Sequence, residues 1–234
     1  MDKEYKIEDL LIERNKLLYE EVSKSLKITL KKMDFWGSQT IQKEVLIAYS
    51  DSIHPSSCFT HELLHAKYHL KGLTIPTIYN RKNLSNELFV FIFNQLSHHK
   101  FFKEFCEMGF KKEEFLHESD IKQVKIEAER VISQLEKEFS EVGELNGSIS
   151  LLTPYLMLIS PHDKTNTSLD YINRLKAIGK ETFFETIDSI LLEWTNQSSY
   201  DSSFTFARIM KACNYQEIGF SINGEKEICY SSKV

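Results

Sequence analysis

The sequence predicts an α+β fold that is predominantly helical, with a small sheet in its N-terminal half. Three observations lead to this class. Apolar residues recur at helical spacing through most of the chain, strand-like runs are short, and a hairpin signal lies near the C-terminus. A chain of 234 residues with 41% hydrophobic residues can bury a substantial core. A change in composition near residue 147 suggests two parts, 1–146 and 147–234, although one continuous domain is equally compatible with the sequence.

The N-terminal segment is expected to hold one helix and two strands. Leucines at helical spacing predict an amphipathic helix from Ile7 to about Leu26. A brief apolar–polar alternation over 28–30 predicts a strand. The segment 45–49 is apolar throughout, which is typical of a strand in the interior of a sheet.

Helices are expected through most of the remaining chain, and a β-hairpin is expected at its end. The predicted helical ranges are 58–71, 83–96 with an extension over 101–108, 113–142, 169–178, 181–194 and 204–213, with a helical or extended segment at 148–160. Gly72 is expected to end the first of these helices. The segments 218–222 and 225–230 flank Asn223-Gly224, the strongest two-residue signal for a hairpin turn.

The composition excludes some classes of binding partner and favours one cellular compartment. A net charge of -5 argues against a nucleic-acid partner, because it implies no basic face. No run approaches the roughly 18 apolar residues of a membrane span, and the charged N-terminus lacks a signal-peptide pattern. The four cysteines, Cys58, Cys106, Cys213 and Cys229, are widely scattered, which favours reduced thiols and a cytoplasmic location.

The most informative motif is His61-Glu62-Leu63-Leu64-His65, which has the pattern HExxH. Two histidines four positions apart on a helix lie about 40° apart around its axis, so both imidazoles can bind one metal ion. Glu62 lies on the same flank, where it can take a proton from a water on the metal. The motif therefore predicts a Zn²⁺ site with Glu62 as the general base.

On this motif the chain resembles the zincins, the HExxH zinc metallopeptidases, which take a third ligand from elsewhere in the chain. The metzincin extension is absent, because Tyr68 and Lys71 stand where its glycine and third histidine would be. The gluzincin branch uses a Glu from a second helix, and Asn86-Glu87 fits this pattern, with 21 residues between His65 and Glu87. The resemblance implies Glu87 as third ligand, although the small residues and Asp that usually follow are missing.

A second candidate for the third ligand lies on the same predicted helix. His98 follows Glu87 by eleven residues, which returns it to the same helix face about 16 Å further along the axis. A regular helix therefore cannot present both to one ion. Glu87 is favoured by the resemblance, and His98, or its neighbour His99, remains the alternative.

The function expected from these residues is that of a zinc metallopeptidase or related amide hydrolase acting on a peptide or protein. Tyr68, Tyr79, His69 and Tyr155 are possible transition-state donors, and nothing in the sequence selects one. In zincins a sheet-edge strand before the motif helix commonly holds the substrate, so by resemblance the Glu44–Tyr49 region would lie near it.

Two alternatives of other classes stay open. One is a zincin-like regulatory or binding protein whose metal site is structural or vestigial. The other is a protein-interaction module that uses the charged helix at 113–142 as its partner surface. An intact Glu62 argues against a purely structural site, because such a site needs no base.

Overall fold

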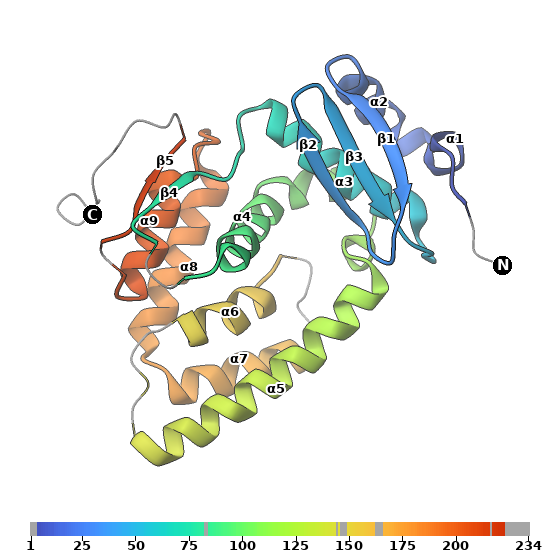
Figure 1. Ribbon diagram of the computed structural model, residues 1–234. Coiled ribbons are helices and arrows are strands. Elements are labelled where there is room, and N and C mark those ends of the chain that lie inside the picture. Colours follow the sequence, from blue (N-terminus) through green and yellow to red (C-terminus); the bar gives the residue numbers. More distant parts are fainter. Residues whose placement is uncertain are drawn as a thin grey trace. The chain divides into compact units, whose positions relative to one another are not determined.

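The computed structural model describes residues 4–81, 84–143, 145, 149–161, 166–215 and 217–222. It is mostly helical, with one three-stranded and one two-stranded sheet, so the predicted α+β class is confirmed (Figure 1). The chain forms two compact units, residues 1–72 with 101–122, and residues 73–100 with 123–234. The division at residue 146 stays a prediction.

The first unit begins with two helices where the sequence suggested one. α1 spans Ile7–Leu10 and α2 spans Glu13–Ser23, with Ile12 extended between them. The side chain of Asn15 explains the break, because its Oδ1 accepts the Ile12 N–H at 2.8 Å. Its Nδ2 donates to the Leu10 carbonyl and to Thr60 Oγ1, both at 3.0 Å. A fully buried amide thus caps α2 and ties the N-terminal segment to the helix that carries Thr60.

Replacing Asn15 with leucine should lower the free energy of unfolding by roughly 2–4 kcal/mol, because several buried polar groups lose their partner at once. Urea denaturation followed by circular dichroism measures the change. Asn196→Leu, at an exposed position near the end of a helix, is the matched control and should change stability little. Equal effects of the two substitutions would show that Asn15 does not tie these elements together.

The three-stranded sheet of the first unit has the order β1-β3-β2. β1 (Lys27–Lys32) runs parallel to β3 (Glu44–Tyr49), and β2 (Gly37–Ile41) runs antiparallel to it. The prediction that 45–49 forms an interior strand is confirmed. β3 is hydrogen-bonded on both sides, and β2 beside it is an edge strand. That the Glu44–Tyr49 region lies near a substrate stays a prediction. β2 escaped prediction because its turn to β3 lacks Gly, Asn and Asp, and Gln42 adopts the left-handed φ of 54° instead.

The motif lies on α3 (Pro55–Leu70), which packs against α1, α2 and the β2 and β3 strands (Figure 1). Pro55 occupies the first turn, where its missing N–H costs no helical hydrogen bond. Gly72 follows the helix with a φ of +94°, so the predicted stop is confirmed. All positions from Ser57 to Leu64 are buried. The packing of α3 therefore fixes the direction of the motif side chains.

α4 (Asn86–Glu107) is one continuous helix that covers both helical segments predicted for this region. Its residues from Phe101 onwards belong to the first compact unit. Gly109 follows the helix with a φ of +88°, and a 3-10 turn, η1 (Lys112–Glu114), comes next.

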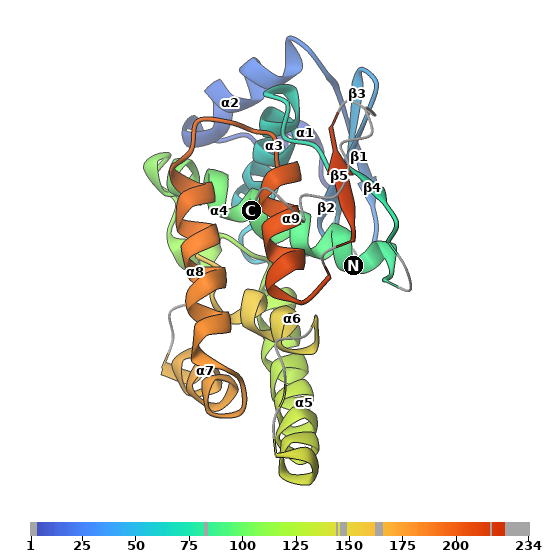
Figure 2. The same cartoon turned by 90° about the vertical axis from the view of Figure 1, so that its left-hand side faces the viewer.

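The second unit contains five further helices and a two-stranded sheet. The helices are α5 (Glu118–Val142), α6 (Ile149–Leu158), α7 (Asn166–Ile178), α8 (Glu181–Asn196) and α9 (Ser203–Ala212). α8 and α9 lie side by side (Figure 2). Trp194 on α8 is fully buried, and its Nε1 donates to the Leu96 carbonyl of α4 at 2.7 Å. The helices predicted from periodicity for this part of the chain are confirmed.

The last described strand has a partner that the sequence did not suggest. β5 (Gly219–Ser221) pairs antiparallel with β4 (Thr77–Tyr79). The strand predicted at 218–222 is thus present. The Asn223-Gly224 turn and the second hairpin strand at 225–230 lie outside the described residues. In the described part of the chain, no helix combines the length and apolar character that crossing a membrane requires.

Candidate metal centre

The two motif histidines direct the same ring nitrogen toward one point. His61 and His65 lie one turn apart on α3, and their Nε2 atoms are 3.1 Å apart. Two nitrogen ligands of a tetrahedral zinc ion, each at about 2.0–2.1 Å, are roughly 3.3 Å apart. Two lone pairs do not face each other at this distance without a proton or a cation between them. The pair therefore has the spacing of two ligands of one metal ion.

His98 on α4 completes a group of three imidazoles. The candidate ligand atoms of His61, His65 and His98 all lie within 4.8 Å of one another. His61 and His98 are buried, at 6% and 2% exposure, and His65 is partly buried. Among the residues that the structure describes, these three histidines are the group of at least three potential ligands that could hold one metal ion.

Of the two candidates for the third ligand, the structure brings His98 to the motif and leaves Glu87 apart from it. Glu87 lies in the first turn of α4 with an exposed side chain. Hydrogen bonds from its own backbone N–H and from Ser85, with the nearby Arg81 charge, lower the pKa of its carboxyl group. Its position eleven residues before His98 on one continuous helix puts it about 16 Å away along the axis. The residue that the resemblance to gluzincins implied therefore lies outside the histidine group.

Aromatic rings surround the two motif imidazoles. The Phe101 ring meets those of His65 and His61 edge-on, at centroid distances of 4.8 and 5.4 Å. Phe115 lies 4.6 Å from His61 on centroids. Both phenylalanines are almost completely buried. The HExxH pattern does not point to these two rings, although Phe101 follows His98 by three positions and hence lies near it on the face of α4.

The apolar surroundings keep a motif histidine neutral. Burial lowers the pKa of His65 to about 4, because a charged imidazolium is poorly solvated among these rings. The ring is therefore neutral at pH 7 and has a lone pair to offer a metal ion. Protonation does not compete with metal binding there at neutral pH.

The carboxylate of Glu104 on α4 binds two side chains from the last turns of α3. Glu104 accepts the Tyr68 hydroxyl at 3.0 Å with one oxygen and Lys67 Nζ at 2.8 Å with the other. Lys67 also donates to Glu21 of α2 at 2.7 Å. Because Lys67 and Tyr68 lie two and three positions after His65 on α3, these contacts hold the motif helix in a defined rotation.

Two of the suggested transition-state donors form hydrogen bonds with carboxylates outside the histidine group. The Tyr68 hydroxyl donates to Glu104, and the Tyr155 hydroxyl donates to Asp188 at 2.7 Å. Burial is the main reason why the pKa of Tyr155 is raised. His69 is partly buried and Tyr79 lies on β4, and neither belongs to the histidine group.

Glu62 is buried between the two motif histidines, at 6% exposure, and is not one of the grouped ligands. Three imidazoles suit zinc among the common divalent ions, although copper, nickel and iron also accept them. Catalytic zinc sites typically have three protein ligands and one open position, whereas structural sites have four. The three imidazoles thus fit a zinc ion without a ligand from Glu62.

Comparisons with known proteins returned no matching protein-family model, no matching curated protein and no matching solved structure.

Proposed function

We propose that the protein is a zinc-dependent hydrolase of peptide or related amide bonds. His61, His65 and His98 would bind the ion, and Glu62 would act as general base. The observation that carries the proposal is the approach of three imidazoles from two helices to within 4.8 Å of one another. An HExxH helix that meets no third ligand would support metal binding much less.

Each side chain has a distinct part in this proposal. Zinc, when bound, would polarise the scissile carbonyl and lower the pKa of a coordinated water towards roughly 7. Glu62 would accept a proton from the attacking water and pass it to the leaving amine. The fully buried Phe101 and Phe115 would exclude bulk water from the imidazoles, which strengthens electrostatic interactions there.

A peptide substrate is supported by the sheet beside the motif helix. β2 is an edge strand that packs against α3, and its outer edge pairs with none of the described strands. An extended peptide could add to such an edge through backbone hydrogen bonds. β2 pairs with the Glu44–Tyr49 strand, so a peptide on this edge would lie near the region that the resemblance implied. We assign the activity to the cytoplasm, a proposal supported by Cys58, Cys106 and Cys213, none of which forms a disulfide among the residues that the structure describes.

The substitution Glu62→Gln tests the proposal directly. Wild type and variant should each bind one zinc ion per chain, because the three ligands are unchanged. Hydrolysis of an unfolded protein such as reduced casein should fall by at least about 100-fold in the variant, since the base is lost. Zinc is measured by atomic emission and cleavage by the release of amino groups. Glu87→Gln, an exposed carboxylate on α4, is the matched control and should retain full activity.

Two results would contradict a hydrolase. In one, Glu62→Gln cleaves the substrate as fast as wild type, so that Glu62 is not the base. In the other, both proteins hold zinc and neither cleaves any substrate in a panel of peptides and unfolded proteins. The second result would favour a structural zinc site in a binding protein, an alternative supported by the burial of His61 and His98.

A further inference from the structure

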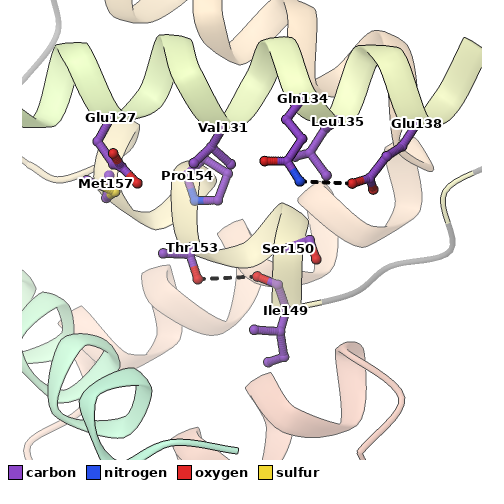
Figure 3. Close-up of a pocket in the computed structure, with 10 residues that line it drawn as sticks. All are labelled: Glu127, Val131, Gln134, Leu135, Glu138, Ile149, Ser150, Thr153, Pro154 and Met157. Carbon is purple, nitrogen blue, oxygen red and sulfur yellow. Dashed lines mark hydrogen bonds between the residues drawn. The ribbon is translucent and has the colours of Figure 1, made fainter.

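A second feature of the chain lies in the second compact unit, far along the sequence from the motif. α5 and α6 enclose a hollow of about 280 Å³ (Figure 3). Side chains from both helices form its wall: Glu127, Val131, Gln134, Leu135 and Glu138 from α5, with Ile149, Ser150, Thr153, Pro154 and Met157 from α6. Small-molecule sites usually measure about 300–1,000 Å³, so this hollow is better suited to one or two side chains of a partner.

The wall of the hollow combines an apolar floor with two carboxylates. Val131 and Leu135 lie between Glu127 and Glu138 on α5, as Figure 3 shows. Glu127 and Glu138 are eleven residues apart, which places them on one helix face about 16 Å apart. No Lys, Arg or His is among the lining residues. The hollow is thus apolar in its middle and acidic toward both ends.

The helix opposite adds a hydrogen-bond acceptor. Pro154 lies inside α6 and has no N–H, so it cannot donate the helical hydrogen bond to the Ser150 carbonyl. The neighbouring Ile149 carbonyl accepts the Thr153 hydroxyl at 3.2 Å, a bond drawn in Figure 3. Ser150 and Pro154 both line the hollow, so this wall includes the point at which α6 lacks one helical hydrogen bond.

The glutamates of α5 differ in the partners they have. Arg174 of α7 binds both Glu129 and Glu136, so each of these two carboxylates has a cation beside it within the fold. Arg130 on the same helix binds Glu127. Glu138 accepts only the uncharged Gln134 amide, at 3.1 Å, among the contacts of the described residues. The carboxylate at one end of the hollow therefore forms no ion pair with any residue in the described ranges.

We propose that this hollow binds a basic, apolar segment of a protein partner. An aliphatic side chain of the partner would fill the space over Val131 and Leu135. A Lys or Arg side chain would pair with Glu138, and a second one would compete with Arg130 for Glu127. This surface would serve partner recognition whether or not the histidine centre is catalytic.

The probe for this surface is a capped hexapeptide, acetyl-Arg-Ala-Leu-Leu-Ala-Lys-amide. Its two charged residues are five positions apart, which spans about 16 Å in an extended chain and matches the separation of the two glutamates. Titration is followed by the NMR shifts of the Val131, Leu135 and Met157 methyl groups. A dissociation constant on the order of 0.1–1 mM is expected for so small an interface. The peptide acetyl-Glu-Ala-Leu-Leu-Ala-Glu-amide should bind at least tenfold more weakly.

Three variants make the test specific. Glu138→Gln should weaken binding of the basic peptide at least threefold, and Thr153→Trp should abolish it by filling the hollow. Glu141→Gln, an exposed carboxylate on α5 outside the lining, should leave binding unchanged. Three results would overturn the proposal. In the first, the basic peptide causes no methyl shifts at 5 mM, a concentration roughly equal to the weakest dissociation constant that such contacts imply. The other two results are that the acidic peptide binds equally well, or that Glu138→Gln binds the basic peptide like wild type.

Discussion

Replacing His98 with alanine should lower the zinc affinity of the purified protein by more than 100-fold, an estimate that follows from the cost of losing a metal-binding group. Loss of a residue that only orients a ligand typically costs 10–100-fold, and loss of the ligand itself should cost more. His61→Ala and His65→Ala should have effects of the same size, because the three imidazoles form one group. Competition with a chromophoric chelator at pH 7 measures the affinities.

The same experiment separates the two candidates for the third ligand. Glu87→Gln should leave the zinc affinity unchanged, because the Glu87 side chain is exposed and lies about three helical turns from His98. Substitution of Co²⁺ adds a spectroscopic check, since the wild type should show the intense absorption of a four-coordinate ion and His98→Ala should lose it. A loss of affinity in Glu87→Gln, with His98→Ala unaffected, would mean that the geometry described here is not that of the zinc-bound protein.

Replacing Phe101 with alanine should lower the free energy of unfolding by about 3–5 kcal/mol, the usual range for truncating a fully buried phenylalanine. The ring packs against His61, His65 and Tyr68 of α3, as well as against Phe115. Its removal would leave a cavity beside both motif imidazoles. The zinc affinity should therefore fall together with the stability, because the imidazoles lose the surface that holds their orientation.

Chemical denaturation with and without zinc measures both effects of this substitution. Phe204→Ala is the matched control, because the Phe204 side chain on α9 is 40% exposed and should contribute much less. Phe101→Leu should recover part of the stability, since it refills most of the cavity. A variant Phe101→Ala that is as stable as Phe204→Ala would show that the aromatic packing around the motif is not formed in solution.

The helices could be predicted from the sequence because a helix leaves a periodic apolar pattern that needs no knowledge of its neighbours. This holds for α8 and α9, whose predicted ranges match those observed within two residues at each end. The elements that escaped prediction depend on particular contacts. β2 follows no usual turn signal, and the break between α1 and α2 depends on Asn15, whose amide also binds Thr60, 45 residues further along the chain.

The sequence could not choose between the two candidates for the third ligand, although it placed both on one helix, which the structure shows as α4. Glu87 and His98 have almost the same angle around the axis of α4, so helical periodicity treats them as equivalent. What separates them is the position along α4 at which α3 packs, and this is set by contacts such as those of Glu104 with Lys67 and Tyr68. A family pattern that lacked its usual continuation favoured the other candidate.

The sequence alone determined that His61 and His65 share one helix face with Glu62 beside them, because residues four apart on a helix are neighbours in any fold. Tertiary structure alone decided that His98 joins them and that Phe101 and Phe115 surround them. The physical reason is that local periodicity fixes directions around a helix axis, whereas the side chains that meet across two helices depend on how those helices pack.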